Sequence, residues 1–319
     1  MTTPEGIEAA VTDVDPEHDE LPPEDVSPAE RRRARAKGQS QARLAWVRFG
    51  MNKLALASLV FIVVLVLAAI AAPLIATHDP IALDVSDSLL PPGTEGHLLG
   101  TDLLGRDVYS RLVYGLRTAL LVGFVAELAA LALAIVIGLI AGYVGGRAEQ
   151  LLMGFTDVMY AFPGYLFAVI LVTVMGRSVL AVILAIAVAS WVGQARLVRA
   201  QTLTLKGRDY IEAARAMGAS GPRIAVRYIL PNAMGPILVA TSFGIPGAIA
   251  TEAGLSLLGL GVQPPTPSWG TMLTEGINYT QVAPHMMLAP AVLFALTLLA
   301  FNWVGDGVRE AFDTTGRAQ

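Results

Sequence analysis

Two glutamates stand inside long apolar stretches of the sequence, where an ionisable side chain can do chemistry. Glu127 and Glu252 each have mainly apolar residues on both sides. Acids in such positions carry protons, line a polar path or hold helices together. Two interpretations therefore stay open. The pair lines a translocation path, as the titrating groups of a proton-coupled secondary transporter do, or it makes hydrogen-bonded contacts between helices at a subunit interface.

A serine and a histidine form the second constellation with chemical potential. Ser256 and His285 fall near the ends of two apolar stretches, as the nucleophile and base of an intramembrane serine protease could. Gly254 precedes Ser256 by two residues, but the second glycine of a nucleophile elbow is missing after it. The protease therefore remains a remote alternative.

Several other kinds of chemistry are excluded by what the sequence lacks. No Gly-Lys-Ser/Thr occurs, so the chain has no phosphate-cradling loop and is not its own ATPase. There is no cysteine, and the 4 histidines are scattered without a ligand spacing typical of a metal site. The sequence predicts a non-enzymatic chain with no catalytic residue, no metal site and no cofactor of its own.

The composition is that of a membrane protein. Hydrophobic residues make up 54% of the 319 residues and charged residues only 15%, whereas a soluble domain has about a quarter charged. Mean hydropathy is +0.59, and we therefore exclude a soluble enzyme and a nucleic-acid-binding module. Six apolar stretches are long enough to cross a bilayer, so the expected fold class is an all-α membrane protein. These stretches are 54–77, 118–143, 158–176, 178–195, 233–261 and 284–304.

Charge divides the rest of the chain and predicts its orientation. Residues 1–30 hold ten acids and no Lys or Arg, which is typical of a disordered tail. Lys and Arg are concentrated in 31–53 and 196–231, so both termini are expected in the cytoplasm, with the basic helix against membrane lipid. The expected divisions are an acidic tail (1–26), a basic interfacial helix (27–53), a first span with its extracytoplasmic segment (54–117), a core (118–310) containing the loop 196–231, and a C-terminal tail (311–319).

The loop 196–231 contains the most informative motif. Glu212-Ala213-Ala214 is followed by Gly218, which can end a helix in a left-handed turn, and later by Leu230-Pro231. This spacing resembles the coupling loop of ABC importer permeases, in which a short helix docks on a separate ATPase subunit. The resemblance implies docking contacts at Glu212, Ala213, Ala214 and Gly218. It implies supporting positions at Asp209, Tyr210, Leu230 and Pro231.

Three further motifs narrow the resemblance. Three runs are similar to the second permease of dipeptide and oligopeptide ABC importers: Gly100 to Arg111, Leu255 to Gly270 and Phe301 to Gly307. That resemblance implies a type I importer permease fold. It also implies three kinds of partner: a second permease that completes the path for di- or oligopeptides, two ABC ATPase subunits that carry ATP and Mg, and an extracytoplasmic solute-binding protein. It implies a multi-pass protein of the cell (plasma or inner) membrane with no nucleic-acid partner. Candidate contacts with the binding protein are Arg106, Asp107, Pro264, Pro267 and Trp269.

Overall fold

A computed structural model describes residues 41–94 and 96–312. The expected tail 1–26 and the first part of the basic helix lie outside the described residues, as does the expected tail 311–319 apart from its first two residues, which end the last helix. The chain divides into two units, residues 1–44 and 45–319, and the second is the folded body. Apart from two isolated β-bridges, the regular structure of the described residues is helical, which confirms the expected fold class.

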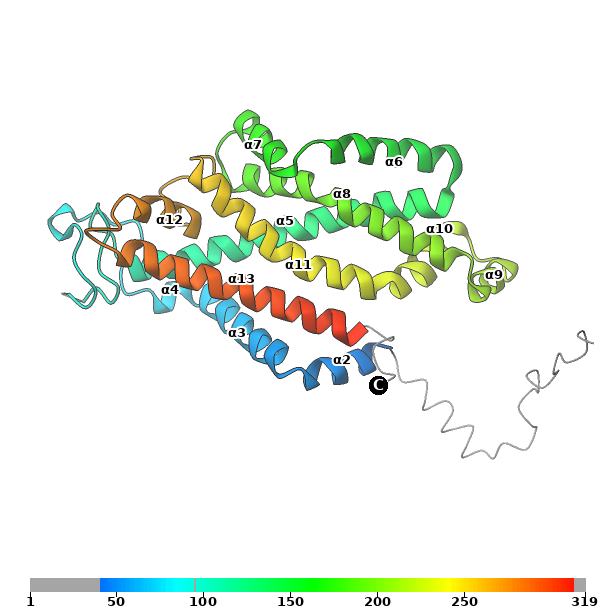
Figure 1. Cartoon of the computed structure of the whole chain (residues 1–319), viewed down its shortest axis with the longest axis horizontal. Helices are drawn as coiled ribbons and strands as arrows, with labels where there is room; N and C mark the ends of the chain where they lie inside the picture. Colours follow the sequence, from blue (N-terminus) through cyan, green and yellow to red (C-terminus); the bar gives the residue numbers. More distant parts are fainter. Residues whose placement is uncertain (1–40, 95, 313–319) are drawn as a thin grey trace, which may run out of the picture. The chain divides into compact units, whose positions relative to one another are not determined.

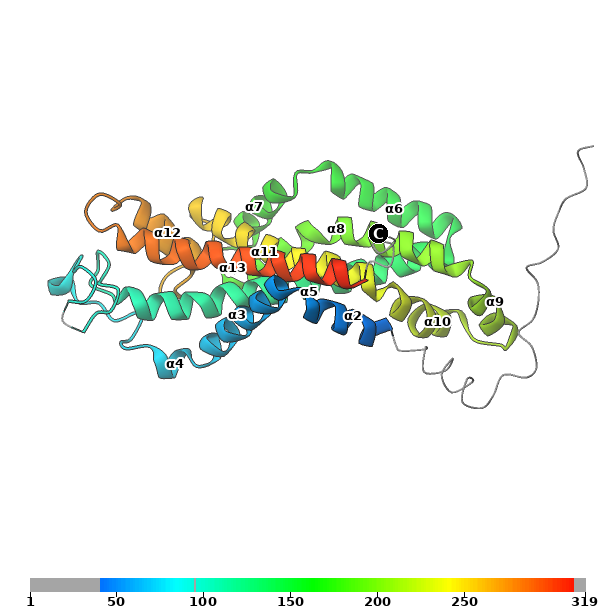
Figure 2. The same ribbon diagram turned by 60° about the horizontal axis from the view of Figure 1, so that its bottom comes forward.

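Most helices follow one another with short connections, but a long segment separates α4 from α5 (Figure 1). They are α2 (Gln41–Met51), α3 (Lys53–Ile70), α4 (Ala72–Ile75), η1 (Val85–Asp87), α5 (Val108–Val144), α6 (Gly146–Ala161), α7 (Gly164–Met175), α8 (Val179–Lys206), α9 (Asp209–Ala216), α10 (Gly221–Ile224), η2 (Ala225–Ile229), α11 (Leu230–Leu257), α12 (Trp269–Ile277) and α13 (His285–Phe312). In both views α9 lies at one end of the long helices, and α12 lies at the other with the α4–α5 segment, residues 76–107 (Figures 1 and 2).

Within the described residues, five helices are individually long and apolar enough to span a bilayer: α3, α5, α8, the continuous α10–α11 stretch and α13. The sixth candidate is the pair α6 and α7, which is bent by 88°. We expected one span over 158–176, but the helix breaks at Phe162-Pro163. Pro163 has no N–H to donate and disfavours helical backbone at Phe162, which is extended with ψ 134°. The pair therefore has the geometry of a broken span or of a re-entrant loop.

Small residues bring α5 and α8 into close contact. A Cβ on Gly138 would lie 2.6 Å from the Val198 Cβ, and a Cβ on Gly142 would lie 2.7 Å from the Thr202 Cβ. The spacing of four between these glycines predicts such an approach in a bilayer. The contact also explains why α8 continues to Lys206, since Val198 and Thr202 are fully buried in it. The expected loop 196–231 is thus helical for its first 11 residues.

Candidate functional site

The short helix α9 has one buried face, which fixes it to the rest of the chain. Ile211 is fully buried, and Ala214, one turn later, is 1% exposed. Ile211 belongs to an apolar cluster with Leu139 of α5, Val198 of α8 and Ile224 of α10. The position of α9 is therefore set by three of the helices around it.

A glycine ends α9, as the sequence predicts. Gly218 has a φ of +81°, in the left-handed region that favours glycine. The Gly218 N–H donates to the Arg215 carbonyl at 3.0 Å, and the Ala219 N–H donates to the Ala214 carbonyl at 3.0 Å. These are the two hydrogen bonds of a Schellman motif. The chain is thereby turned away from the helix axis at a defined residue.

The four predicted docking residues do not share one face of α9. Glu212, Ala213 and Gly218 are exposed, and a Cβ on Gly218 would meet open space. Ala214 packs inward instead, so it can act only by holding α9 in place. Ala213 on α9 and Gly218 just after it are consequently small exposed positions, with Glu212, Arg215 and Met217 exposed in the same stretch.

The predicted supporting residues are mostly exposed, and the actual supports lie elsewhere. Asp209, Tyr210 and Pro231 are exposed, and Leu230 is half-buried. The end of α8, three residues before α9, is tied to α5 by Lys206, whose Nζ donates to the Tyr143 carbonyl at 2.6 Å and lies 5.5 Å from the centre of the Tyr143 ring. Sequence reasoning missed both residues. For Lys206 the sequence did offer a signal, because a lysine in the last turn of a long helix interacts favourably with backbone carbonyls at a helix C-terminus.

Glu127 joins three helices inside the bundle. It is 1% exposed, and the Gln194 side chain of α8 donates to its Oε1 at 2.5 Å. A Cβ on Gly244 of α11 would lie 2.2 Å from the Glu127 carboxyl carbon. The carboxyl group is thus packed between α5, α8 and α11 of this one chain. This geometry favours a contact between helices over an open path.

Glu252 and Ser256 form a local pair that occupies the serine hydroxyl. Ser256 Oγ donates to Glu252 Oε1 at 2.9 Å, and both residues are buried. His285 instead has its Nε2 3.2 Å from the Thr101 carbonyl. Ser256 and His285 therefore have different partners, and the structure does not assemble them as a hydrolytic dyad.

The end of the molecule that carries α12 contains a network of four charged residues, of which Asp102, Arg106 and Arg111 are buried and Glu275 is partly exposed. Asp102 Oδ2 accepts from Arg106 Nε at 2.6 Å and from Arg111 NH1 at 2.5 Å. Glu275 of α12 accepts from Arg106 NH2 at 3.0 Å and lies 3.1 Å from Arg111 NH2. The network ties the α4–α5 segment and the start of α5 to α12. Its members from 102 to 111 stand in the predicted motif, whereas Glu275 gave no sequence signal.

Asp107 caps α5 in the same region. Its Oδ2 accepts from the Ser110 backbone N–H at 2.7 Å. Burial raises the pKa of Asp107, but hydrogen bonds from His97, Ser110 and Thr77 outweigh it and hold the pKa below its ordinary value. The carboxylate therefore accepts hydrogen bonds at the helix N-terminus in its charged form at neutral pH.

Four of the five candidate contacts for a binding protein are buried within the described chain. Arg106 and Asp107 are enclosed by the charged network and the α5 cap, and Pro267 is also buried. Trp269 is fully buried, and its Nε1 donates to the Leu112 carbonyl at 2.9 Å. These side chains hold α12 and the α4–α5 segment in place, and Pro264 alone among the five is exposed.

Two of the histidines are not scattered, contrary to the expectation from their spacing. The rings of His78 and His97 are stacked with centroids 4.4 Å apart, and both face Asp107. Residues 19 positions apart meet here because the α4–α5 segment folds back on the start of α5. Short-range spacing carries no signal for such a cluster.

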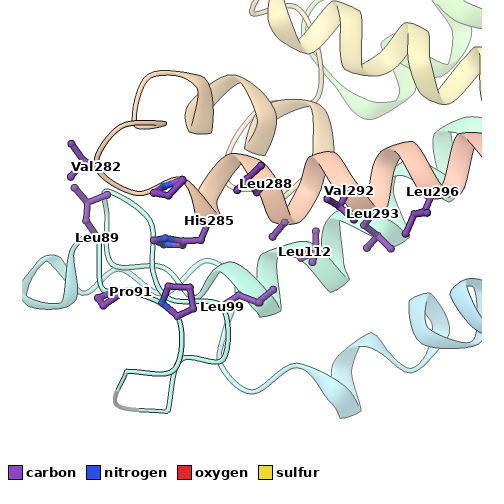
Figure 3. A pocket seen from close by; sticks show the side chains of 13 residues that line it. Leu89, Pro91, Leu99, Leu112, Val282, His285, Leu288, Val292, Leu293 and Leu296 are labelled. Atoms are coloured by element: carbon purple, nitrogen blue, oxygen red, sulfur yellow. The ribbon is translucent and has the colours of Figure 1, made fainter.

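An apolar hollow of about 870 Å³ lies between α13 and the α4–α5 segment. Figure 3 shows Leu99 from the segment, Leu112 from α5 and Val292 from α13 around the same space. His285 is the one titratable side chain in its lining. Because its lining is mainly apolar, the hollow suits an apolar ligand and not a charged solute.

Comparisons with known proteins agree with this architecture. Residues 134–315 match the family model for the binding-protein-dependent transport system inner membrane component, and residues 40–92 match the N-terminal TM domain of oligopeptide transport permease C. The chain is 38% identical over 269 residues to the oligopeptide transport system permease protein of Bacillus subtilis, covering 84% of this chain and 88% of that one. It is 41% identical to the glutathione transport system permease protein of Pectobacterium atrosepticum, covering 84% and 89% respectively.

Solved structures support the fold. The methionine ABC transporter MetNI, in inward-facing conformations, matches with a TM-score of 0.52 and 19% identity over 64% of this chain and 96% of that chain. These findings confirm the predicted permease and disfavour the secondary transporter and the protease. This chain belongs to the family of binding-protein-dependent transport system inner membrane components, the membrane-spanning permease subunits of ABC importers.

Proposed function

We propose that this chain forms, with a second permease, the path of an ATP-driven importer for dipeptides or oligopeptides. Its relatives include the dipeptide transport system permease protein of Bacillus subtilis, at 39% identity over 271 residues. The names of the oligopeptide and glutathione permeases describe other peptides. Peptide bonds are common to all of these substrates, so we propose that the solute transported through this chain is also a peptide.

The single observation that carries the mechanism is the exposed small-residue side of α9 on a braced helix. Ala213 and Gly218 offer a surface on which another protein can pack closely, while Ile211 and Ala214 anchor α9 inside. Movement imposed on the exposed side would pass through the anchor to α5, α8 and α10. In our proposal, two ATPase subunits carrying ATP and Mg²⁺ dock on this surface, and their closure rocks the long helices between outward and inward access.

Charge supports placing α9 in the cytoplasm. Four arginines around it are exposed, and positive charge is retained on the cytoplasmic side of membrane proteins. These are Arg208, Arg215, Arg223 and Arg227. With an even number of spans, both termini are then cytoplasmic, and the α12 end faces a solute-binding protein outside the plasma or inner membrane.

Affinity purification tests the assembly. The tagged chain is isolated from its native membrane in mild detergent, and the copurifying proteins are identified by mass spectrometry. We expect a second permease, ABC ATPase chains and a solute-binding protein whose bound ligand is a peptide. Recovery of the chain alone, under conditions that keep a known ABC importer intact, would contradict the proposal.

Substitutions in α9 test the coupling directly. Ala213→Trp and Gly218→Asn add bulk to the exposed side, and Asn tolerates the left-handed backbone of Gly218. In reconstituted complexes we expect peptide uptake to fall about tenfold or more, as loss of about 1.4 kcal/mol of docking energy would produce, with the chain still folded. Ala200→Trp, at an exposed position on α8 before α9, is the matched control and should transport normally. Normal uptake by both α9 variants would exclude α9 as the docking element.

A further inference from the structure

Three side chains from separate parts of the α4–α5 region converge on one point. His78 follows α4, His97 lies in the loop before α5, and Asp107 is the N-cap of α5. His97 Nδ1 is 2.9 Å and His78 Nδ1 is 3.9 Å from Asp107 Oδ1. One potential ligand atom from each residue lies within 4.8 Å of the others.

These separations match the coordination sphere of a small transition-metal ion. With Zn–N and Zn–O bonds of about 2.0–2.2 Å and tetrahedral angles, neighbouring ligand atoms are about 3.3 Å apart. The two measured separations, 2.9 Å and 3.9 Å, fall on either side of that value. The third separation, between the two imidazole nitrogens, is within 4.8 Å. A change of about half an ångström at the first two, together with a turn of the stacked rings that points both nitrogens at one position, would therefore admit the ion.

The surroundings hold Asp107 in the orientation that a ligand needs. Its Oδ2 is occupied by the Ser110 N–H and by the Thr77 hydroxyl, at 2.7 Å and 3.2 Å. Its Oδ1 is left facing the two imidazoles. The backbone N–H of His78 donates to Ser110 Oγ at 3.0 Å, which fixes the backbone that carries the His78 imidazole. Such hydrogen bonds to ligands are the outer shell that orients a metal site.

The cluster is closed on one side and open on the other. The side chains of Asp107 and His97 are 0% and 9% exposed, whereas that of His78 is 42% exposed. A cation can thus enter past His78 and keep a water molecule as its fourth ligand. Three protein ligands with an open position are a known arrangement for zinc.

We propose that His78, His97 and Asp107 form a binding site for a divalent transition-metal ion of the Zn²⁺ class. Two imidazoles and a carboxylate suit zinc and its neighbours better than Ca²⁺ or Mg²⁺, which prefer oxygen ligands. The bound ion cross-links the residues after α4, the loop before α5 and the N-terminus of α5. It would thereby stiffen the α12 end of the permease, independently of the coupling at α9.

Cobalt provides a direct test, because Co²⁺ in a tetrahedral site absorbs visible light. The complex is purified through a tag without histidines, treated with a chelator and titrated with Co²⁺ and then with competing Zn²⁺. We expect one strongly bound ion per chain, displaced by Zn²⁺. His78→Ala should weaken binding about tenfold or more, because removing a ligand costs at least as much as removing its outer-shell partner.

Matched variants separate this site from other histidines. His285→Ala and His18→Ala should leave the cobalt spectrum and affinity unchanged. His97→Gln provides a second ligand variant, and a thermal unfolding curve of each shows whether the chain still folds. The proposal is overturned if the parent chain gives no tetrahedral cobalt spectrum, or if His78→Ala and His97→Gln, while folded, bind as tightly as the parent. In that case His97 serves only as a hydrogen-bond donor to the α5 cap.

Discussion

The two ends of the helix bundle use their motif residues in opposite ways. At the α9 end, Glu212, Ala213 and Gly218 are exposed and have few partners among the described residues. At the α12 end, Asp102, Arg106 and other motif residues are buried and hydrogen-bonded to one another. Both motifs were assigned intermolecular contacts from the sequence, and three of the four α9 residues are exposed, whereas Pro264 is the one exposed candidate at the α12 end.

The difference follows from residue type. Small side chains next to a left-handed glycine leave a helix side open for a partner. Charged side chains in a tight turn find their partners within the chain, because burying an unpaired charge is costly. A motif of charged residues in a permease can therefore specify the shape of a segment without touching another protein.

The largest expected effect lies in the buried charged network. Asp102→Asn removes the carboxylate shared by Arg106 and Arg111, which leaves two buried cations with Glu275 alone. We expect a loss of about 3–5 kcal/mol in the free energy of unfolding. Glu275→Gln is the control, since the Glu275 side chain is 33% exposed and should cost about 1 kcal/mol or less. Thermal unfolding of the purified variants measures both, and equal losses would show that the network is not organised around Asp102.

The contact between α5 and α8 should be the next most sensitive feature. In Gly138→Ala the new Cβ would lie 2.6 Å from the Ala195 carbonyl oxygen, so the helices must separate. We expect a loss of about 1–3 kcal/mol from this overpacking. Gly193→Ala places a Cβ in open space and should be neutral or stabilising by up to about 1 kcal/mol. If unfolding midpoints do not separate these variants, close packing does not hold α8 in place.

A smaller effect is expected where α12 is attached to α5. Trp269→Phe keeps most of the ring but removes the N–H that donates to the Leu112 carbonyl. We expect a loss of about 1 kcal/mol, the usual net value of one hydrogen bond. A hydrogen-exchange measurement should show faster exchange in α12 and unchanged exchange in α9. Faster exchange at α9 as well would mean that the two ends are mechanically linked.

Much of the fold could be predicted because it depends on local patterns. Apolar stretches locate the helices, and Gly218 ends α9 at the expected residue. The break at Phe162-Pro163 was readable in principle, since proline disfavours the preceding helical residue. It was missed because apolar composition alone does not distinguish a straight span from a broken one.

The parts that could not be predicted depend on contacts between distant residues. Arg106 meets Glu275 across 169 residues of sequence, and no spacing rule connects them. Gln194 joins Glu127 in the same way, from a different helix. The inward turn of Ala214 depends on which side of α9 the neighbouring helices cover. The resemblance thus identified the family, while the burial of each motif residue required the structure.

Single-cysteine labelling at α9 tests the central claim most directly, because the chain contains no cysteine of its own. Ala213→Cys and Ala214→Cys are reacted with a water-soluble maleimide, first in the isolated chain and then in the assembled complex. We predict rapid labelling at position 213 in the isolated chain, strong protection there after assembly, and slow labelling at position 214 in both states. Equal labelling at position 213 in both states would contradict the claim that the exposed side of α9 contacts a partner.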